Sequence, residues 1–190
     1  MNETLKTIYD RRSIGKLTLP MPATDELSVM LQTAFTAPDH KQLKPWQVVV
    51  LTDDALDEFG RVLLSAAKQV ADEQGQSLDD TACTKFVNMP KRAPMIIMVA
   101  TNTKPHDKVP PFEQLLSTGA FIQNLLLAVQ SLGYRSIWRS GDLTNHALVK
   151  AYFGVADKDD ICGFIYVGSS DVVMPEREAV ALEDFVKFKR

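Results

Sequence analysis

The stretch PMIIMVA at residues 94–100 decides the fold class, because every residue after its proline is apolar. A strand with two apolar faces belongs inside a sheet that is covered on both sides. A second strand is predicted at residues 46–51, where WQVVVL is rich in β-branched side chains. Shorter strands are predicted at residues 136–139 and 162–167. The chain is therefore expected to form a central sheet with helices on its faces.

Helical patterns separate these strands. Helices are predicted at residues 2–10, 54–73, 78–88, 112–132 and 144–153, and from residue 24 until Pro38 stops the chain from continuing as a helix. The order is not a regular βαβ repeat, so we expect an α+β fold. No charged residue lies between Gln114 and Tyr134, yet seven polar residues do, which indicates a buried helix rather than a membrane span. Such a helix must be covered nearly all round, so a dimer interface is expected as its second cover.

Length and composition restrict the function classes. A chain of 190 residues is expected to form one domain, and a net charge of −3 argues against nucleic-acid binding as the main function. The two cysteines, Cys83 and Cys162, are far apart and support neither a disulfide framework nor a four-ligand zinc site. The N-terminus lacks the apolar core of a signal peptide, so a cytoplasmic location without membrane attachment is expected.

Common catalytic signatures are absent from the sequence. It has no phosphate-loop, GxGxxG, HExxH or GxSxG motif. The three histidines, His40, His106 and His146, do not have the spacing of metal ligands, so no metal site is expected. Side-chain nucleophiles and metal ions are therefore not indicated as the source of chemistry.

Three segments could bind a ligand instead, and the first is Arg11-Arg12-Ser13 directly after the opening helix. Two guanidinium groups and a hydroxyl suit a phosphomonoester, which carries nearly two negative charges and three acceptor oxygens. The alternative is that the arginines only stabilise the C-terminus of the helix, where cations are favoured.

The second segment is APDHKQLKPW at residues 37–46, a polar loop between two prolines that precedes a buried strand. Function often lies on loops that a rigid scaffold holds. The alternative is an ordinary surface turn with Trp46 as a packing residue. The third segment is GYRSIWRSG at residues 133–141, which could place backbone amides and flat side chains along a planar ring system. It could equally be a strand with polar ends.

Together and in this order, the three segments resemble those of the nitroreductase family of flavin enzymes, in its short and compact branch. The match includes RRS at residues 11–13, the 37–46 loop, a long buried helix and the 133–141 strand, and it covers the chain from about residue 5 to its tail. The family fold implies a central mixed, mainly antiparallel sheet. The resemblance divides the chain into an FMN-binding domain at residues 1–174 and a C-terminal arm at residues 175–190 that reaches the partner subunit.

The resemblance also implies a homodimer that holds two FMN molecules at the subunit interface. Under this resemblance, the phosphate and ribityl chain of FMN would be held by Arg11, Arg12 and Ser13. His40 would contact the flavin, with Gln42 from the same loop, either within one subunit or across the interface. Residues lining the ring or phosphate region would be Trp138, Arg139 and Ser140. Larger members carry a basic K-x-R near the tail, of which this chain keeps only Arg177.

The implied activity is oxidoreduction, in which hydride passes from NAD(P)H through the flavin to a small acceptor in a ping-pong cycle. The acceptor would be a nitroaromatic, a quinone or a similar electron-poor compound. Arg139 or Lys41 would stabilise the negative charge of the reduced flavin near N1 and O2, and the sequence leaves both open. Alternatives are a dimeric flavin- or ligand-binding module without turnover, a plain dimeric interaction domain, and a flavin enzyme of the same scaffold with different chemistry.

Overall fold

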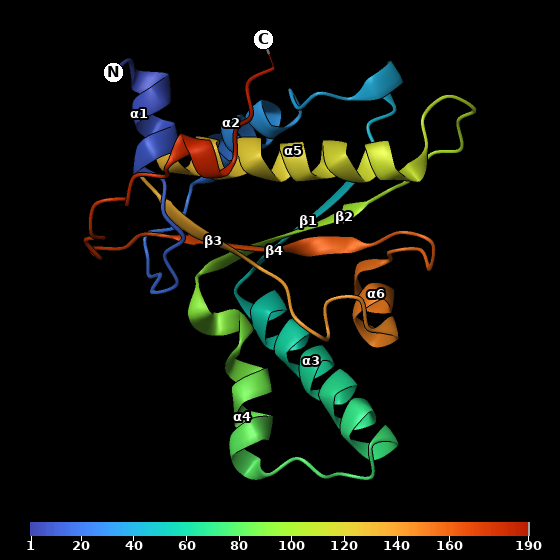
Figure 1. Ribbon diagram of the computed structural model, residues 1–190. Coiled ribbons are helices and arrows are strands. Elements are labelled where there is room, and N and C mark those ends of the chain that lie inside the picture. Colours follow the sequence, from blue (N-terminus) through green and yellow to red (C-terminus); the bar gives the residue numbers. More distant parts are fainter. Residues whose placement is uncertain (190) are drawn as a thin grey trace.

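The computed structural model, described here for residues 1–189, contains one four-stranded antiparallel sheet (Figure 1). Its strands are β1 (Trp46–Thr52), β2 (Met95–Thr101), β3 (Arg135–Arg139) and β4 (Ile161–Gly168), in the order β1-β2-β4-β3. Each neighbouring pair is antiparallel, and the parallel element is one isolated bridge between Ser13 and Ser136. This arrangement confirms the expected α+β fold.

Helices cover both faces of the sheet (Figure 1). One face packs against α5 (Pro111–Ser131) and α2 (Thr24–Ala34), and the other against α3 (Asp54–Glu73) and α6 (Ala147–Phe153), with α4 (Asp80–Asn88) beside α3. The short α1 (Glu3–Asp10) contacts α5. Single 3-10 turns lie at His40–Gln42, Pro90–Arg92 and Leu182–Asp184.

All seven residues of β2 are buried, as its apolar sequence predicts. Its side chains alternate between the two layers, because successive residues of a strand point to opposite faces. Ile96 and Met98 belong to the core on the α3 side, and Ile97 and Val99 to the core on the α5 side. The strand therefore joins the two halves of the hydrophobic core.

The helix predicted at residues 112–132 is α5, which has nine buried residues. Its outer face is not fully covered within one chain, since Phe112, Leu115 and Leu116 are 65%, 42% and 57% exposed. Across residues 1–189, no helix combines the length and apolar character that crossing a membrane requires.

The helix predicted from residue 144 begins three residues later. The side chain of His146 caps α6 by accepting from the backbone N–H of Leu148 at 3.2 Å. Thr144, the expected cap, instead accepts from the backbone N–H of Gly141 at 2.7 Å. The competing turn contact explains the difference, because a threonine hydroxyl stabilises loops as readily as helix ends.

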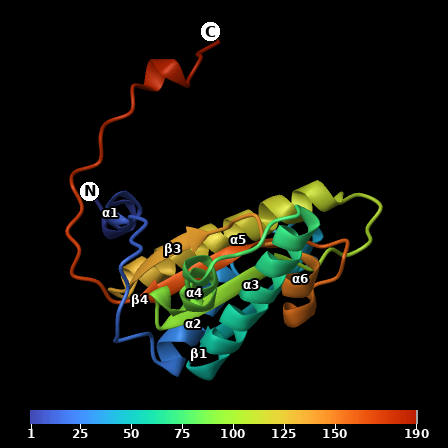
Figure 2. The same ribbon diagram turned by 90° about the horizontal axis from the view of Figure 1, so that it is seen from below.

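After β4 the chain leaves the domain and runs past α1 as an extended segment (Figure 2). Two long-range contacts tie its first part to the end of α1. A guanidinium nitrogen of Arg12 donates to the carbonyl of Pro175 at 3.3 Å, and one of Arg177 donates to the carbonyl of Arg11 at 2.9 Å. From residue 171 to residue 189 every residue is exposed.

Candidate functional site

Three guanidinium groups gather where α1 ends. Arg11 and Arg12 follow the helix directly, and the extended C-terminal segment brings Arg177 against the backbone of Arg11. Burial lowers the pKa of Arg11, and the nearby charges of Arg177 and Arg12 lower it further. The ion pairs found within residues 1–189, His40–Glu113 and Lys91–Asp57, leave all three arginines without a carboxylate partner. Such a concentration of positive charge favours an anionic ligand.

Arg12 partly has the alternative role that the sequence suggested for its segment, which is to stabilise the C-terminus of the helix. One of its guanidinium nitrogens donates to the carbonyl of Tyr9 at 3.0 Å, so the side chain satisfies the end of α1. The same residue lines an open cavity of about 570 Å³ between α1, β3 and the C-terminal segment. The cavity is lined by Tyr9, Asp10, Arg12, Ile14, Arg135 and residues 172–177.

Ser13 is exposed and lies beside the first half of β3 through its bridge with Ser136. The backbone N–H of Ile14 donates to the carbonyl of Ser136 at 3.0 Å, which holds the RRS segment along the edge strand. The edge of β3 therefore connects the arginine cluster to the residues at the strand's other end, Trp138, Arg139 and Ser140.

Trp138 is held in a fixed position on β4. Its indole nitrogen donates to the carbonyl of Cys162 at 3.0 Å, and the ring packs directly over Gly163. A Cβ on Gly163 would overlap the indole, and its φ of +148° is one that other residues rarely adopt. The indole stays 41% exposed, so a flat surface remains available beside the strand.

Arg139 points to the α3 side of the sheet, with its guanidinium carbon 5.7 Å from the centre of the Tyr166 ring. Its Nε is buried and has no hydrogen-bond partner among the described residues. A buried donor without a partner is costly, so this atom is a candidate ligand contact.

Arg139 and Ser140 line a second cavity, of about 470 Å³, between α3, α4 and the loop after β3. Lys85 and Arg92 reach the same cavity, and its remaining walls are largely apolar, with Phe59, Phe86 and Phe164 among them. Burial raises the pKa of Tyr166 there, while the charges of Arg139 and Arg92 oppose that shift. Sequence reasoning missed Arg92, although a basic residue three positions before a buried strand could have drawn attention to it.

The 37–46 loop is held in an unusual conformation on α5. Lys41, Gln42 and Lys44 all have positive φ angles, of 64°, 53° and 50°. Such angles cost about 1–3 kcal/mol each for residues other than glycine, and they occur often at functional sites. A hydroxyl of α5 holds the loop, since Ser117 donates to the carbonyl of Pro38 at 2.9 Å. The hydroxyl of Thr118 lies 3.4 Å from the carbonyl of Pro45 and closer, at 3.0 Å, to that of Gln114 in its own helix.

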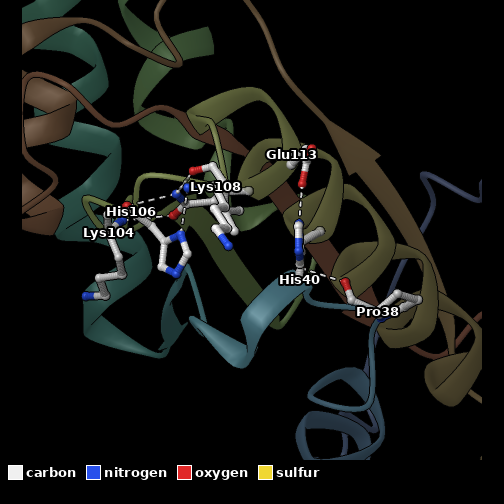
Figure 3. A network of polar contacts seen from close by, with 9 residues as sticks. Pro38, His40, Lys104, His106, Lys108 and Glu113 are labelled. Carbon is white, nitrogen blue, oxygen red and sulfur yellow. Dashed lines mark hydrogen bonds and ion pairs between the residues drawn. The ribbon is translucent and has the colours of Figure 1, made fainter.

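Trp46 is a packing residue, since the centre of its ring lies 5.8 Å from that of Phe35 and 5.3 Å from that of Phe121. His40 is exposed, and its Nδ1 lies 2.7 Å from Oε2 of Glu113 (Figure 3). Neither His40 nor Gln42 lines either cavity. One chain therefore brings Arg11, Arg12 and Ser13 to one end of β3 and Trp138, Arg139 and Ser140 to the other. Of these six residues, Arg12 lines the first cavity and Arg139 and Ser140 line the second, whereas the other three, like the histidine loop, line neither.

Comparison with known proteins gives a consistent result. The profile described as "Nitroreductase family" matches residues 8–169. The protein named "Putative NAD(P)H nitroreductase YdjA" of Escherichia coli K12 is 36% identical over 167 residues, which is 88% of each chain. A second "Putative NAD(P)H nitroreductase", of Haemophilus influenzae, is 30% identical over 98% of this chain and 99% of its own.

Solved structures share the fold. A nitroreductase-like family protein from Bacillus cereus superposes with a TM-score of 0.83 at 21% identity, covering 100% of this chain and 97% of the other. A nitroreductase with bound FMN from Bacteroides fragilis gives a TM-score of 0.73 at 22% identity, covering 100% of both chains. At these identities the likeness establishes the fold.

Proposed function

The chain belongs to the nitroreductase family, and from that premise we propose that it is an FMN-dependent oxidoreductase. It takes hydride from NAD(P)H and passes it to a small electron-poor acceptor, such as a nitroaromatic or a quinone, in a ping-pong cycle. The arginine cluster at the end of α1 is the observation that carries this proposal.

The cluster fits the phosphate of FMN. Arg11 and Arg177 lie close enough for their charges to act on each other, and no carboxylate in the described chain pairs with them. A phosphate dianion would neutralise this charge and accept several of the donors at once. Ser13 supplies an exposed hydroxyl at the same end of β3. These residues would hold the anionic end of the cofactor.

Residues at the other end of β3 fit the flavin ring. On the α3 side of the sheet, Arg139 offers the buried Nε that no described residue accepts from, and Ser140 offers an exposed hydroxyl that lines the same cavity. Trp138 offers a fixed, partly exposed indole on the opposite face of β3. When bound, FMN supplies the two-electron redox chemistry between NAD(P)H and the acceptor. Of the two cations considered for stabilising the reduced flavin, we favour Arg139. It lines a cavity with largely apolar walls, whereas Lys41 is exposed on a loop that lines neither cavity.

A homodimer would complete the site. The loop with His40 and Gln42 lies apart from both cavities, so its residues would act on the cofactor held by the partner subunit. The exposed apolar residues of α5 and of the C-terminal arm, which include Phe185 at 77% and Phe188 at 82% exposure, would be covered by that partner. A cytoplasmic location is part of the proposal, because the two unpaired cysteines suit a reducing compartment.

The visible spectrum of the purified protein tests the proposal. We expect flavin absorption, either as isolated or after FMN is added and the excess removed. Anaerobic NADH or NADPH should then bleach the flavin, and a nitroaromatic or quinone should restore its colour. A colourless protein that takes up no FMN would overturn the proposal. Stable colour without bleaching would indicate a binding module, and bleaching without recovery would indicate a different acceptor chemistry.

A further inference from the structure

The contact between His40 and Glu113 determines which nitrogen of the imidazole carries a hydrogen. Nδ1 of His40 lies 2.7 Å from Oε2 of Glu113, and the two side chains point toward each other (Figure 3). A carboxylate has no hydrogen to donate, so the hydrogen of this bond is on Nδ1. In a neutral imidazole the other nitrogen, Nε2, then carries a lone pair and can only accept a hydrogen bond.

The other two histidines of the chain have the opposite arrangement. Nδ1 of His106 accepts from the backbone N–H of Lys108 at 3.0 Å (Figure 3), and Nδ1 of His146 accepts from that of Leu148 at 3.2 Å. A nitrogen that accepts carries no hydrogen, so both neutral rings are protonated on Nε2. His40 thus differs from both, because its partner is a carboxylate rather than an amide N–H.

Rigid structure holds both sides of the contact. Glu113 lies in the first turn of α5, and the following residue, Gln114, is only 2% exposed and binds the preceding loop through both of its amide atoms. Ser117, one turn further along α5, holds the loop of His40 by donating to the carbonyl of Pro38. The helix is thus attached to both loops, which places the backbones of Glu113 and His40 side by side, while their two side chains stay 40% and 49% exposed.

We propose that Glu113 is a positioning residue that fixes the ring and tautomer of His40, so that Nε2 is presented as an acceptor to a hydroxyl or N–H group of the ligand. For the identity of that ligand, the inference rests on the proposed function: FMN carries hydroxyls on its ribityl chain and an N–H on its ring. A phosphate oxygen is also an acceptor and would not pair with Nε2. The inference therefore places His40 at the polar chain or ring of the cofactor, away from its phosphate.

Nitrogen NMR of the full chain labelled with ¹⁵N-histidine tests the tautomer directly, with or without flavin. At a pH high enough for all three rings to be neutral, we expect one ring protonated on Nδ1 and two protonated on Nε2. The His40→Gln variant identifies the signals of His40, and His106 and His146 serve as internal controls. An Nε2–H form of His40, or hydrogens on both of its nitrogens, would overturn the proposal.

Variants then test the role of Glu113. Glu113→Ala should move the signals of His40 toward the Nε2–H form without changing those of the other histidines. Glu113→Gln keeps an oxygen that accepts the same bond and should preserve the Nδ1–H form. Ser117→Ala, which removes a loop contact but not the partner of His40, should leave the tautomer unchanged. If His40 keeps its tautomer in Glu113→Ala, the positioning role is wrong.

FMN affinity gives the functional readout. Glu113→Ala and His40→Ala should each raise the dissociation constant of FMN roughly threefold to tenfold, as expected for the loss of one hydrogen bond. The double variant should be no weaker than the single ones, because both remove the same contact. Equal FMN affinity in Glu113→Ala and the parent would overturn the binding role. A parent that binds no FMN would instead overturn the proposed function, and the tautomer result would stand by itself.

Discussion

Arg11 differs from an ordinary surface arginine in both its burial and its neighbours. It is partly buried, and two further guanidinium groups, those of Arg12 and Arg177, lower its pKa through their charges. Like charges at short range destabilise one another unless a counter-charge is present. The free protein therefore accepts an electrostatic cost at this position, which a bound phosphate would relieve.

We predict that Arg11→Ala and Arg177→Ala each raise the dissociation constant of FMN tenfold or more, since a hydrogen bond to a charged group contributes about 1.5–3 kcal/mol. Arg61→Ala is the matched control, because Arg61 is an exposed arginine on α3 at another site. Flavin fluorescence quenching measures the affinity, and raising the salt concentration should weaken the parent more than either variant. Parent-like affinity in both variants would exclude the cluster as the phosphate site.

Cys162 is expected to react slowly. Burial, with a smaller contribution from the charge of Asp160, raises the pKa of its thiol to about 11. At pH 8.5 an ordinary cysteine is about half ionised, whereas a thiol with a pKa of about 11 is only about 0.3% thiolate. Alkylation of Cys162 in a Cys83→Ser background, followed by peptide mass spectrometry, should be far slower in the folded chain than in the same chain unfolded in denaturant. It should accelerate as the pH rises toward 11. Equal rates in the two states would contradict the partly buried position of the thiol.

At the scale of elements, the pair α3 and α4 forms one wall of the cavity that Arg139 lines. The two helices approach closely at Gly60, where a Cβ would collide with the backbone carbonyl of Val87. Backbone atoms cannot rotate away as a side chain does, so the spacing of the helices depends on this glycine.

We predict that Gly60→Ala destabilises the fold by about 1–3 kcal/mol, the usual cost of overpacking, despite the better helix propensity of alanine. Ser65→Ala, at an exposed position of the same helix, should change stability by no more than about 0.5 kcal/mol. Urea unfolding followed by circular dichroism measures both. If Gly60→Ala were as stable as the parent, the close approach of α3 and α4 would not be as described.

At the scale of the whole molecule, a single chain leaves apolar side chains exposed to solvent on two separate segments. On α5 they are Phe112, Leu115 and Leu116, and along the arm they are Val180, Leu182, Phe185 and Phe188. Exposed apolar side chains of this kind favour association in water, because burying them removes apolar surface from the solvent. The last part of the arm extends away from the sheet and its helices (Figure 2). Under the proposed function, a second copy would cover its apolar residues.

We predict that the full chain has twice the mass of one 21.1 kDa chain in light scattering, and that a chain ending at Arg177 dissociates at low micromolar concentration. The truncation keeps the residues that line the cavity near α1 and removes the outer apolar residues of the arm. The double variant Phe185→Ser/Phe188→Ser, which keeps the full length, should show the same trend. A full chain with the mass of a single copy would exclude the dimer, and an undissociated truncation would exclude a role for the arm.

The elements of the fold and the position of part of the candidate site could be predicted from the sequence, because both depend on local pattern. The apolar run of β2, the uncharged stretch of α5 and the RRS segment after α1 are visible as short stretches of residues, and each lies where predicted. Arg12 shows the limit of such reasoning, since the same residue both caps its helix and lines a cavity.

Contacts between distant residues could not be predicted, since no local pattern encodes them. Arg177 meets Arg11 across 166 residues, His40 meets Glu113 across 73, and the guanidinium of Arg139 on β3 lies over the ring of Tyr166 on β4. Local periodicity sets which residues form helices and strands, because hydrogen bonding and burial repeat along the chain. Tertiary packing sets which side chains meet, because it alone determines which distant segments become neighbours.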